Sequence, residues 1–269
     1  MRVDWRERTV SIGGAELMLR SAGRGRPLLV LHEELGDPGP LGWQADLAAE
    51  RELLLPLHPG FGRTPRLEWI AGMRDLACFY AAWLRAERLA PVDVVGTSFG
   101  GWLAAEAIAN DPSLFRRVVL VAPPGIRPAA GEIFDLFTVT AAKYVQASVV
   151  DRSAPELPLL FGGKRTPEQF EAWEDARAQV ARLAWQPYLF NPSLPRLLAL
   201  VPAPPTLLVW GREDPIVPLA VGEAYARAVA GARLVVLDGC GHRPEIERRE
   251  AFVGAVRDFL GAAVAAALA

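Results

Sequence analysis

Short apolar runs of strand length alternate with longer stretches of helical period along most of this chain. A polar, alternating segment, Thr9 to Leu19, opens the pattern. The apolar runs that follow it are Leu28–Leu31, Leu53–Leu57, Val92–Val95, Val118–Ala122, Thr206–Trp210 and Leu234–Leu237. This rhythm is typical of βαβ units, so it predicts an α/β fold built on a largely parallel sheet.

The clearest helical stretch covers about residues 70–89. Its apolar side chains recur at helical spacing and form one stripe, which consists of Met73, Leu76, Ala77, Tyr80, Trp83 and Leu84. A helix with one apolar stripe buries that stripe against a neighbouring layer. We therefore expect this helix to cover one face of the sheet.

The rhythm stops between Gly125 and Pro205, a span too long for an ordinary connection between a strand and a helix. Stiff proline-rich breakers bound this span on both sides. The simplest interpretation is an inserted helical cap. We therefore expect a core domain made of residues 1–126 and 202–269, a cap made of residues 127–201, and a cleft between the two.

The composition excludes several classes of protein. The chain has 269 residues, of which 51% are hydrophobic, and its formal net charge is -2. A charge so close to zero gives no electrostatic reason to expect nucleic acid or an anionic membrane surface as a partner. The N-terminal residues mix both signs of charge, and no apolar run reaches the roughly 18 residues of a membrane span. A soluble, cytoplasmic protein is the expectation.

The few cysteines and histidines argue against a metal centre. Cys78 and Cys240 are too few for a disulfide framework and lack the paired spacing of a zinc site. The three histidines, His32, His58 and His242, are scattered along the chain. We expect no metal, no cofactor and a small molecule as the partner, whereas a monomer and a homodimer both remain open.

The segment 96–100 reads Gly-Thr-Ser-Phe-Gly and stands between a strand-like run and a helical stretch. A G-x-S-x-G sequence in this context places its serine on a sharp, strained turn above the sheet. The flanking glycines avoid clashes with the neighbouring strand and helix. Ser98 is therefore the predicted nucleophile.

A serine hydroxyl needs a base to accept its proton, and the base needs an acid to orient it. His32 and His58 end strands upstream of Ser98, and we interpret both as structural. His242 follows the last strand, at the same carboxyl edge of the sheet as Ser98, so it is the predicted base.

The predicted acid is Asp214, which follows the strand 206–210 at the carboxyl edge of the sheet. Two alternatives remain open. Asp214 could be only a turn-forming residue before Pro215, and Glu213 could be the true partner of the histidine.

Together these motifs resemble the α/β-hydrolase superfamily, in particular the capped branch of carboxylesterases and of C–C bond hydrolases that act on ring-cleavage products. The matching segments are Gly96–Gly101, His58–Gly62, Trp210–Pro218 and Gly241–Glu247, and the chain order Ser, Asp, His also agrees. The resemblance implies an α/β-hydrolase fold with a mostly parallel, eight-stranded sheet, flanking helices and an inserted helical cap. It also makes His58–Gly62 a structural loop beside the site.

One position departs from the pattern of that superfamily. The strand before the first long helix usually ends in His-Gly, whereas Glu33 follows His32 here. By analogy, the backbone N–H groups of Glu34 and Phe99 form the oxyanion hole, where side-chain identity is permissive. A carboxylate aimed into the pocket would repel the oxyanion. We therefore expect Glu33 to point away or to hydrogen-bond locally and narrow the substrate range, with neither carboxylate in contact with Ser98.

The expected cap is rich in aromatic side chains, which suits an aliphatic or aromatic ester, although most of them should form the cap's own core. On the expected helix 167–184, Arg177 lies within an apolar stripe. It could bind a substrate carboxylate or extend into solvent. The candidates for lining the substrate pocket are His32, Glu33, Phe137, Trp173, Arg177 and Trp185.

Three functions are consistent with these motifs. The leading prediction is a serine hydrolase that cleaves a small apolar or aromatic carboxylic ester through an acyl-enzyme on Ser98. The alternatives are a C–C bond hydrolase acting on a dienoate-type ring-cleavage product, and a non-catalytic ligand-binding protein on the same fold. The intact serine, aspartate and histidine weigh against the last. Arg243 departs from the tryptophan common in C–C hydrolases, which favours the ester.

Overall fold

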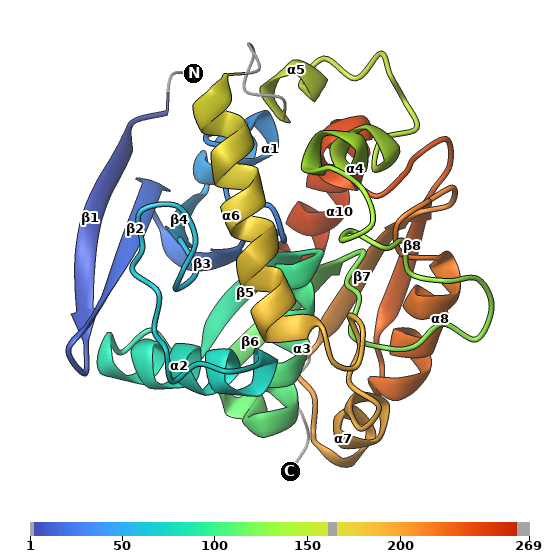
Figure 1. The fold of residues 1–269 in the computed structure, drawn as a ribbon. Helices are drawn as coiled ribbons and strands as arrows, with labels where there is room; N and C mark the ends of the chain where they lie inside the picture. The colour runs from blue at the N-terminus through green and yellow to red at the C-terminus, as the bar shows by residue number, and fades with distance from the viewer. Residues whose placement is uncertain (1–2, 161–165, 263–269) are drawn as a thin grey trace.

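A twisted sheet with helices on both of its faces forms the body of the protein (Figure 1). The structure is a computed structural model that describes residues 3–160 and 166–262. Within these residues, eight strands form one sheet in the order β1-β2-β4-β3-β5-β6-β7-β8. The strands are β1 (Trp5–Ile12), β2 (Ala15–Gly23), β3 (Arg26–Leu31), β4 (Arg51–Pro56), β5 (Val92–Thr97), β6 (Phe115–Val121), β7 (Thr206–Gly211) and β8 (Arg233–Leu237).

Most of the strand pairs in this sheet are parallel. Strands β1 and β2 form an antiparallel hairpin, and β2 is also antiparallel to β4. All the other pairs, from β4 through β3, β5, β6 and β7 to β8, are parallel. The predicted mostly parallel, eight-stranded sheet is therefore confirmed.

The six apolar runs of the sequence correspond to strands β3 to β8. All six residues of β7 are buried, because helices cover both faces of a parallel sheet. The polar segment from Thr9 to Leu19 is different, since it contains the turn of the β1–β2 hairpin. Gly13 and Gly14 form this turn with φ angles of 53° and 83°, which residues with a side chain rarely adopt.

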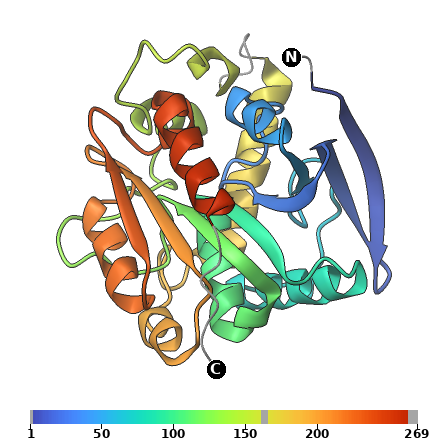
Figure 2. The ribbon, with the colours of Figure 1, turned by 180° about the vertical axis from the view of Figure 1, so that it is seen from behind.

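Two layers of helices cover the sheet. Helices α1 (Gly42–Ala48) and α10 (Arg249–Gly261) pack on each other on the face turned to the viewer in Figure 2. The opposite layer contains α2 (Met73–Ala86), α3 (Phe99–Asn110), α7 (Leu194–Leu200) and α8 (Leu219–Ala228), which contact one another in that order. The predicted helix at 70–89 is α2, and its whole apolar stripe is buried. Two short elements complete these layers, the 3-10 turn η1 (Pro112–Leu114) and helix α9 (Pro244–Glu247).

The segment expected to form a cap leaves the core and returns to it at one point. The N–H of Gly125 donates to the carbonyl of Leu189 at 2.8 Å, and the N–H of Asn191 donates to the carbonyl of Gly125 at 2.9 Å. Between them lie α4 (Ala141–Ala147), α5 (Leu157–Leu160) and the long helix α6 (Pro167–Ala184), which crosses the front of the molecule in Figure 1.

Helix α7 follows that segment, and it packs on α3 and α8 of the core, although we expected residues up to 201 to belong to the cap. The division of the chain into a core and a cap stays a prediction. None of the helices in residues 3–160 and 166–262 combines the length and the hydrophobicity that a membrane-spanning helix needs. The same residues contain no cluster of three or more His, Cys, Asp or Glu side chains that could hold a metal ion.

Candidate active site

Ser98 lies at the turn between strand β5 and helix α3, in a strained conformation. Its φ angle is 45°, a region that residues with a side chain rarely adopt, and its N–H donates to the carbonyl of Val121 at 2.8 Å. A Cβ atom added at Gly100 would lie 2.2 Å from the carbonyl oxygen of Leu31, and one added at Gly96 would lie 2.5 Å from that of Gly100. Glycine at both positions therefore lets β3, β5 and α3 approach closely enough to form the turn.

A chain of two hydrogen bonds connects Ser98 to His242 and His242 to Asp214. Nε2 of His242 lies 2.9 Å from Oγ of Ser98, and Nδ1 of His242 lies 2.8 Å from Oδ2 of Asp214. All three side chains are buried. An ionised carboxylate only accepts hydrogen bonds, so Nδ1 carries the proton and Nε2 is free to accept the proton of Ser98. This arrangement can turn a serine hydroxyl into a nucleophile.

Asp214, not Glu213, contacts the histidine. The second carboxylate oxygen of Asp214 accepts hydrogen bonds from the N–H groups of Ile216 at 2.8 Å and Val217 at 2.9 Å, which fix the carboxylate in place. The carboxylate of Glu213 instead accepts from the N–H of Cys240 at 3.0 Å. The turn after β7 therefore aims the aspartate at His242 and the glutamate at the neighbouring loop.

The two backbone groups expected to form the oxyanion hole come from different loops. Phe99 is the first residue of α3, so its N–H has no carbonyl partner within the helix. Glu34 lies in a tight turn after β3, which is closed by a hydrogen bond from the N–H of Gly36 to the carbonyl of Glu33 at 3.2 Å. The role of these two N–H groups stays a prediction.

The side chains of the two glutamates behave differently, and one expectation is wrong. Oε2 of Glu33 lies 2.5 Å from Nη1 of Arg243, as expected for a local contact. The carboxylate of Glu34, however, accepts a hydrogen bond from the hydroxyl of Tyr144 at 2.6 Å and also interacts with the hydroxyl of Ser98. The expectation that neither carboxylate contacts Ser98 is therefore wrong for Glu34. The hydroxyl of Tyr144, on α4, donates to the carboxylate of Glu34 and fixes this carboxylate beside Ser98.

The surroundings of these carboxylates shift their pKa values in opposite directions. Burial raises the pKa of Glu33 to about 7, although Arg243 counteracts the shift. Burial likewise raises the pKa of Glu245 to about 7. Burial also opposes ionisation of Glu34, but the charges of His242 and Arg243 and its hydrogen bonds outweigh burial and lower its pKa. The glutamate beside Ser98 is thus the one held in its charged form.

His32 and His58 form a buried pair below the site. Nε2 of His32 accepts the N–H of His58 at 3.0 Å, and Nδ1 of His58 lies 2.6 Å from the hydroxyl of Tyr80. Burial lowers the pKa of His32 to about 4 and lowers that of His58 as well, so both rings are neutral. Their contacts are those of structural residues.

The other candidates for the substrate pocket are distributed over several places. Glu33 and Trp173 line a cavity of about 90 Å³ between α6 and the loop after β3, whereas His32 and Glu33 line a smaller one of about 30 Å³. Phe137 and Trp185 pack on each other with ring centroids 5.0 Å apart. Trp185 is half exposed and borders a different groove, next to residues 71–74. Arg177 is paired with Glu174 and also donates to the carbonyl of Phe137 at 3.4 Å.

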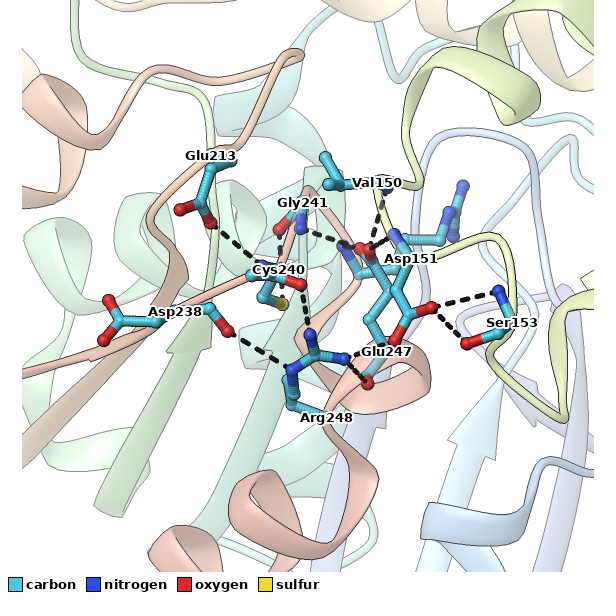
Figure 3. Close-up of polar contacts among 11 residues, drawn as sticks. Val150, Asp151, Ser153, Glu213, Asp238, Cys240, Gly241, Glu247 and Arg248 are labelled. Atoms are coloured by element: carbon cyan, nitrogen blue, oxygen red, sulfur yellow. Dashed lines mark hydrogen bonds and ion pairs between the residues drawn. The ribbon is translucent and has the colours of Figure 1, made fainter.

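The carboxylate of Glu247, whose role the sequence did not reveal, fixes the loop that carries His242. Oε1 of Glu247 accepts the N–H groups of Gly241 at 2.9 Å and of Arg243 at 3.4 Å, which flank the histidine. Oε2 accepts the N–H groups of Val150 at 2.8 Å and of Asp151 at 2.7 Å (Figure 3). One buried carboxylate thus joins the histidine loop to the segment after α4.

Two further contacts strengthen this junction. The N–H of His242 donates to the carbonyl of Ser148 at 2.9 Å, and Nε of Arg243 donates to the hydroxyl of Ser148 at 2.9 Å. Figure 3 shows Arg248 between Asp151 and the turn before Gly241, and its Nη1 lies 2.6 Å from the carboxylate of Asp151. The backbone of His242 is therefore held on both sides.

The chain is similar to known proteins over most of its length. The chain matches the model of the "Alpha/beta hydrolase family" from residue 28 to residue 255. It is 29% identical to the 2-hydroxymuconate semialdehyde hydrolase of Pseudomonas sp. (strain CF600), over 97% of this chain and 96% of the relative. It is 28% identical to the pimeloyl-[acyl-carrier protein] methyl ester esterase of Neisseria meningitidis, over 64% of this chain and 69% of the relative.

A solved structure shows the same fold. The 2-hydroxy-6-oxo-6-phenylhexa-2,4-dienoate hydrolase of Rhodococcus sp. strain RHA1 superposes with a TM-score of 0.75 at 22% identity, covering 97% of this chain and all of that one. The family model covers most of the chain, including the segments that carry Ser98, Asp214 and His242. The protein therefore belongs to the alpha/beta hydrolase family.

Proposed function

We propose that this protein is a serine hydrolase that cleaves small carboxylic esters through an acyl-enzyme on Ser98, with His242 as base and Asp214 as its orienting acid. The observation that carries the proposal is the buried hydrogen-bond chain between these three side chains, with distances of 2.9 Å and 2.8 Å. The turn that holds Ser98 in a strained conformation between β5 and α3, with glycine at positions 96 and 100, supports the same assignment.

In the first half of the proposed reaction, Oγ of Ser98 attacks the ester carbonyl while its proton moves to Nε2 of His242. The N–H groups of Phe99 and Glu34 stabilise the oxyanion of the tetrahedral intermediate. When this intermediate collapses, the bond between the carbonyl carbon and the alcohol oxygen breaks. The alcohol leaves with the proton from Nε2, and the acyl group remains on Ser98.

In the second half, His242 takes a proton from water, and the resulting hydroxide attacks the acyl carbonyl. The intermediate expels Oγ of Ser98, which recovers the proton from Nε2, and the carboxylic acid is released. Asp214 gains no proton in either half of the reaction. Its carboxylate keeps the proton of His242 on Nδ1 and stabilises the positive charge of the ring when Nε2 is also protonated.

The charges around Ser98 favour an ester over a ring-cleavage product. A dienoate carries its own carboxylate, and the ionised carboxylate of Glu34 interacts with the Ser98 hydroxyl where such a substrate would bind. The neighbouring cation, Arg243, is paired with Glu33 through Nη1 at 2.5 Å and with Ser148 through Nε at 2.9 Å, which leaves Nη2 without a partner in the described structure. A neutral ester avoids this repulsion.

A C–C bond hydrolase is the second candidate, and one observation favours it. The relatives that match over nearly the whole chain include the 2-hydroxymuconate semialdehyde hydrolase and a 2-hydroxy-6-oxo-2,4-heptadienoate hydrolase of Pseudomonas putida, at 29% and 28% identity. The esterase relative matches 64% of this chain.

The two candidates can be separated by direct turnover. We expect the protein to hydrolyse p-nitrophenyl butyrate and octanoate, and to convert a ring-cleavage dienoate more slowly or not at all. A fluorophosphonate that inactivates the protein should add its mass to the peptide that contains Ser98. Turnover of the dienoate alone would assign the second candidate, and labelling of a different residue would remove Ser98 from the mechanism.

The pH dependence of kcat/KM should follow the protonation of His242. Burial lowers the pKa of His242, but the charge of Asp214, its hydrogen bond and the charge of Glu34 outweigh burial and raise it. Only the neutral ring can accept the proton of Ser98, so activity rises as pH increases through this raised pKa. Because the carboxylate of Glu34 contributes to the shift, Glu34→Gln should move the acid limb to lower pH.

The measurement is the pH–rate profile of both proteins on one neutral ester, from about pH 5 to pH 9. Glu33 and Glu245 also titrate near pH 7, so the displacement between the two profiles matters more than either midpoint. A profile of Glu34→Gln that coincides with the wild-type profile would contradict the prediction.

Glu247→Gln should weaken the hydrogen bonds that hold the loop carrying His242 in place. In the wild type, each carboxylate oxygen of Glu247 accepts two backbone N–H groups. Glutamine has one acceptor oxygen, so its NH2 group would have to face one of these two pairs of N–H groups, donor against donor. We expect the free energy of unfolding to fall by about 1–3 kcal/mol and kcat to fall by about tenfold or more, with KM less affected.

Thermal unfolding and steady-state kinetics measure the two effects. Glu223→Gln is the matched control, since Glu223 is exposed on α8 and its carboxylate lies 4.0 Å from the guanidinium of Arg227. If Glu247→Gln unfolds at a lower temperature but keeps its kcat below that temperature, the carboxylate supports the fold without positioning His242.

A further inference from the structure

The carboxylate of Glu34 has an oxygen that no group of the described chain satisfies. Glu34 is 4% exposed, and its Oε1 accepts the hydroxyl of Tyr144 at 2.6 Å. Within residues 3–160 and 166–262, Oε2 is buried and accepts no hydrogen bond of good geometry. The carboxylate also interacts with the hydroxyl of Ser98, so the open acceptor belongs to a group at the reaction centre.

A buried acceptor of a charged group is costly to leave open, because it has lost its water and gained no donor. The neighbouring donors are committed elsewhere. Tyr144 has a single hydroxyl proton, which points to Oε1 of Glu34. The hydroxyl proton of Ser98 is needed by His242, 2.9 Å away. An N–H or ammonium group of a bound substrate is the natural donor for Oε2.

The charge balance around Ser98 points in the same direction. Three buried carboxylates, those of Glu33, Glu34 and Glu245, interact with a single guanidinium, that of Arg243. Nη1 of Arg243 is paired with Glu33 at 2.5 Å, whereas Nη2 has no hydrogen-bond partner in the described structure. Even with Glu33 and Glu245 half protonated near pH 7, the four groups keep a net charge of about -1.

We propose that Glu34 is a specificity-determining residue, and that its carboxylate binds a protonated amino group close to the scissile carbonyl of the substrate. The inference rests on the proposed ester hydrolysis and narrows its substrate class to amino-substituted carboxylic esters. A cation at this position also offsets the repulsion between Glu34 and the oxyanion that forms beside it. Such a substrate turns an unfavourable charge of the free enzyme into a binding contact.

Three p-nitrophenyl esters of similar size test the proposal. They are the esters of 3-aminopropanoic acid, which is cationic, of butanoic acid, which is neutral, and of succinic acid, which is anionic. Each kcat/KM is divided by the hydroxide-catalysed rate of the same ester, so that differences in intrinsic reactivity cancel. We expect the wild type to prefer the cationic over the neutral ester by about tenfold or more, and to disfavour the anionic ester.

The variants then locate the source of this preference. Glu34→Gln should bring the ratio of cationic to neutral ester close to one. Tyr144→Phe should keep the preference for the cation, because it removes a donor and leaves the charge of Glu34 in place. Glu16→Gln is the matched control, since Glu16 is exposed on β2 and should keep the wild-type ratio.

The possible outcomes separate this inference from the proposed function. Absence of turnover on all three esters would overturn the proposed function itself. Turnover of all three esters at rates that do not depend on their charge would overturn the inference and leave ester hydrolysis standing. A preference for the succinate ester, whose carboxylate would then bind the guanidinium of Arg243, would have the same meaning. A Glu34→Gln variant that slows all three esters equally would show that the carboxylate only tunes His242.

Discussion

The Ser98→Ala variant is expected to hydrolyse esters about 10,000-fold or more slowly than the wild type, because alanine has no hydroxyl with which to form the acyl-enzyme. The side chains that surround Ser98 remain, so binding in the ground state should change little and the loss should appear in kcat. The measurement is steady-state hydrolysis of p-nitrophenyl butyrate, with enough enzyme to resolve a residual rate above the uncatalysed reaction.

The substitution should leave the fold intact. Alanine keeps the Cβ atom that the turn already accommodates at a φ angle of 45°, and the N–H of position 98 still donates to the carbonyl of Val121. Ser113→Ala is the matched control, since Ser113 is exposed and its hydroxyl donates to the carboxylate of Asp111, away from the site. Equal activity of Ser98→Ala and the wild type would remove the proposed mechanism.

The Asp214→Asn variant is expected to lose about 1,000- to 10,000-fold in kcat, although its shape hardly changes. An asparagine that keeps the hydrogen bonds from Ile216 and Val217 through its oxygen must turn its NH2 group toward Nδ1 of His242. The ring then places its proton on Nε2, where it can no longer accept the proton of Ser98. Catalysis falls because the histidine is held in the wrong tautomer.

Glu213→Gln provides the control for this prediction, since it removes one negative charge at the adjacent position. Its carboxylate bonds to the N–H of Cys240 at 3.0 Å, so the variant should lose no more than a few-fold in kcat. Steady-state kinetics on the same ester compares the two proteins. A large loss in Glu213→Gln together with a small loss in Asp214→Asn would exchange the roles of these two residues.

The parts of the fold that depend on local pattern could be predicted from the sequence. The apolar runs correspond to β3 to β8, and the amphipathic stretch 167–184 corresponds to α6 with the same ends. These elements could be predicted because the spacing of apolar side chains within a strand or a helix depends only on neighbouring residues in the sequence. The proximity of Ser98, Asp214 and His242 followed from placing each of them after a parallel strand, since the carboxyl ends of such strands share one edge.

The contacts that shape the site could not be predicted in this way. Tyr144 lies 110 positions from Glu34, and their hydrogen bond depends on how α4 sits above the loop after β3. Likewise, Glu247 joins the histidine loop to Val150 through packing between two irregular segments. No periodicity in the sequence encodes such pairings, and the expectation about the Glu34 carboxylate failed for this reason.

The meeting of Leu189 and Asn191 with Gly125 has a consequence for how such a protein can diversify. Because the excursion from residue 126 to residue 188 starts and finishes at one hydrogen-bonded crossing, its length can vary without changing the distance that the core must span. The entropy needed to close a longer excursion grows only slowly with its length. Segments of other sizes and sequences could therefore be exchanged at this crossing, giving new substrate ranges to an unchanged set of reacting groups.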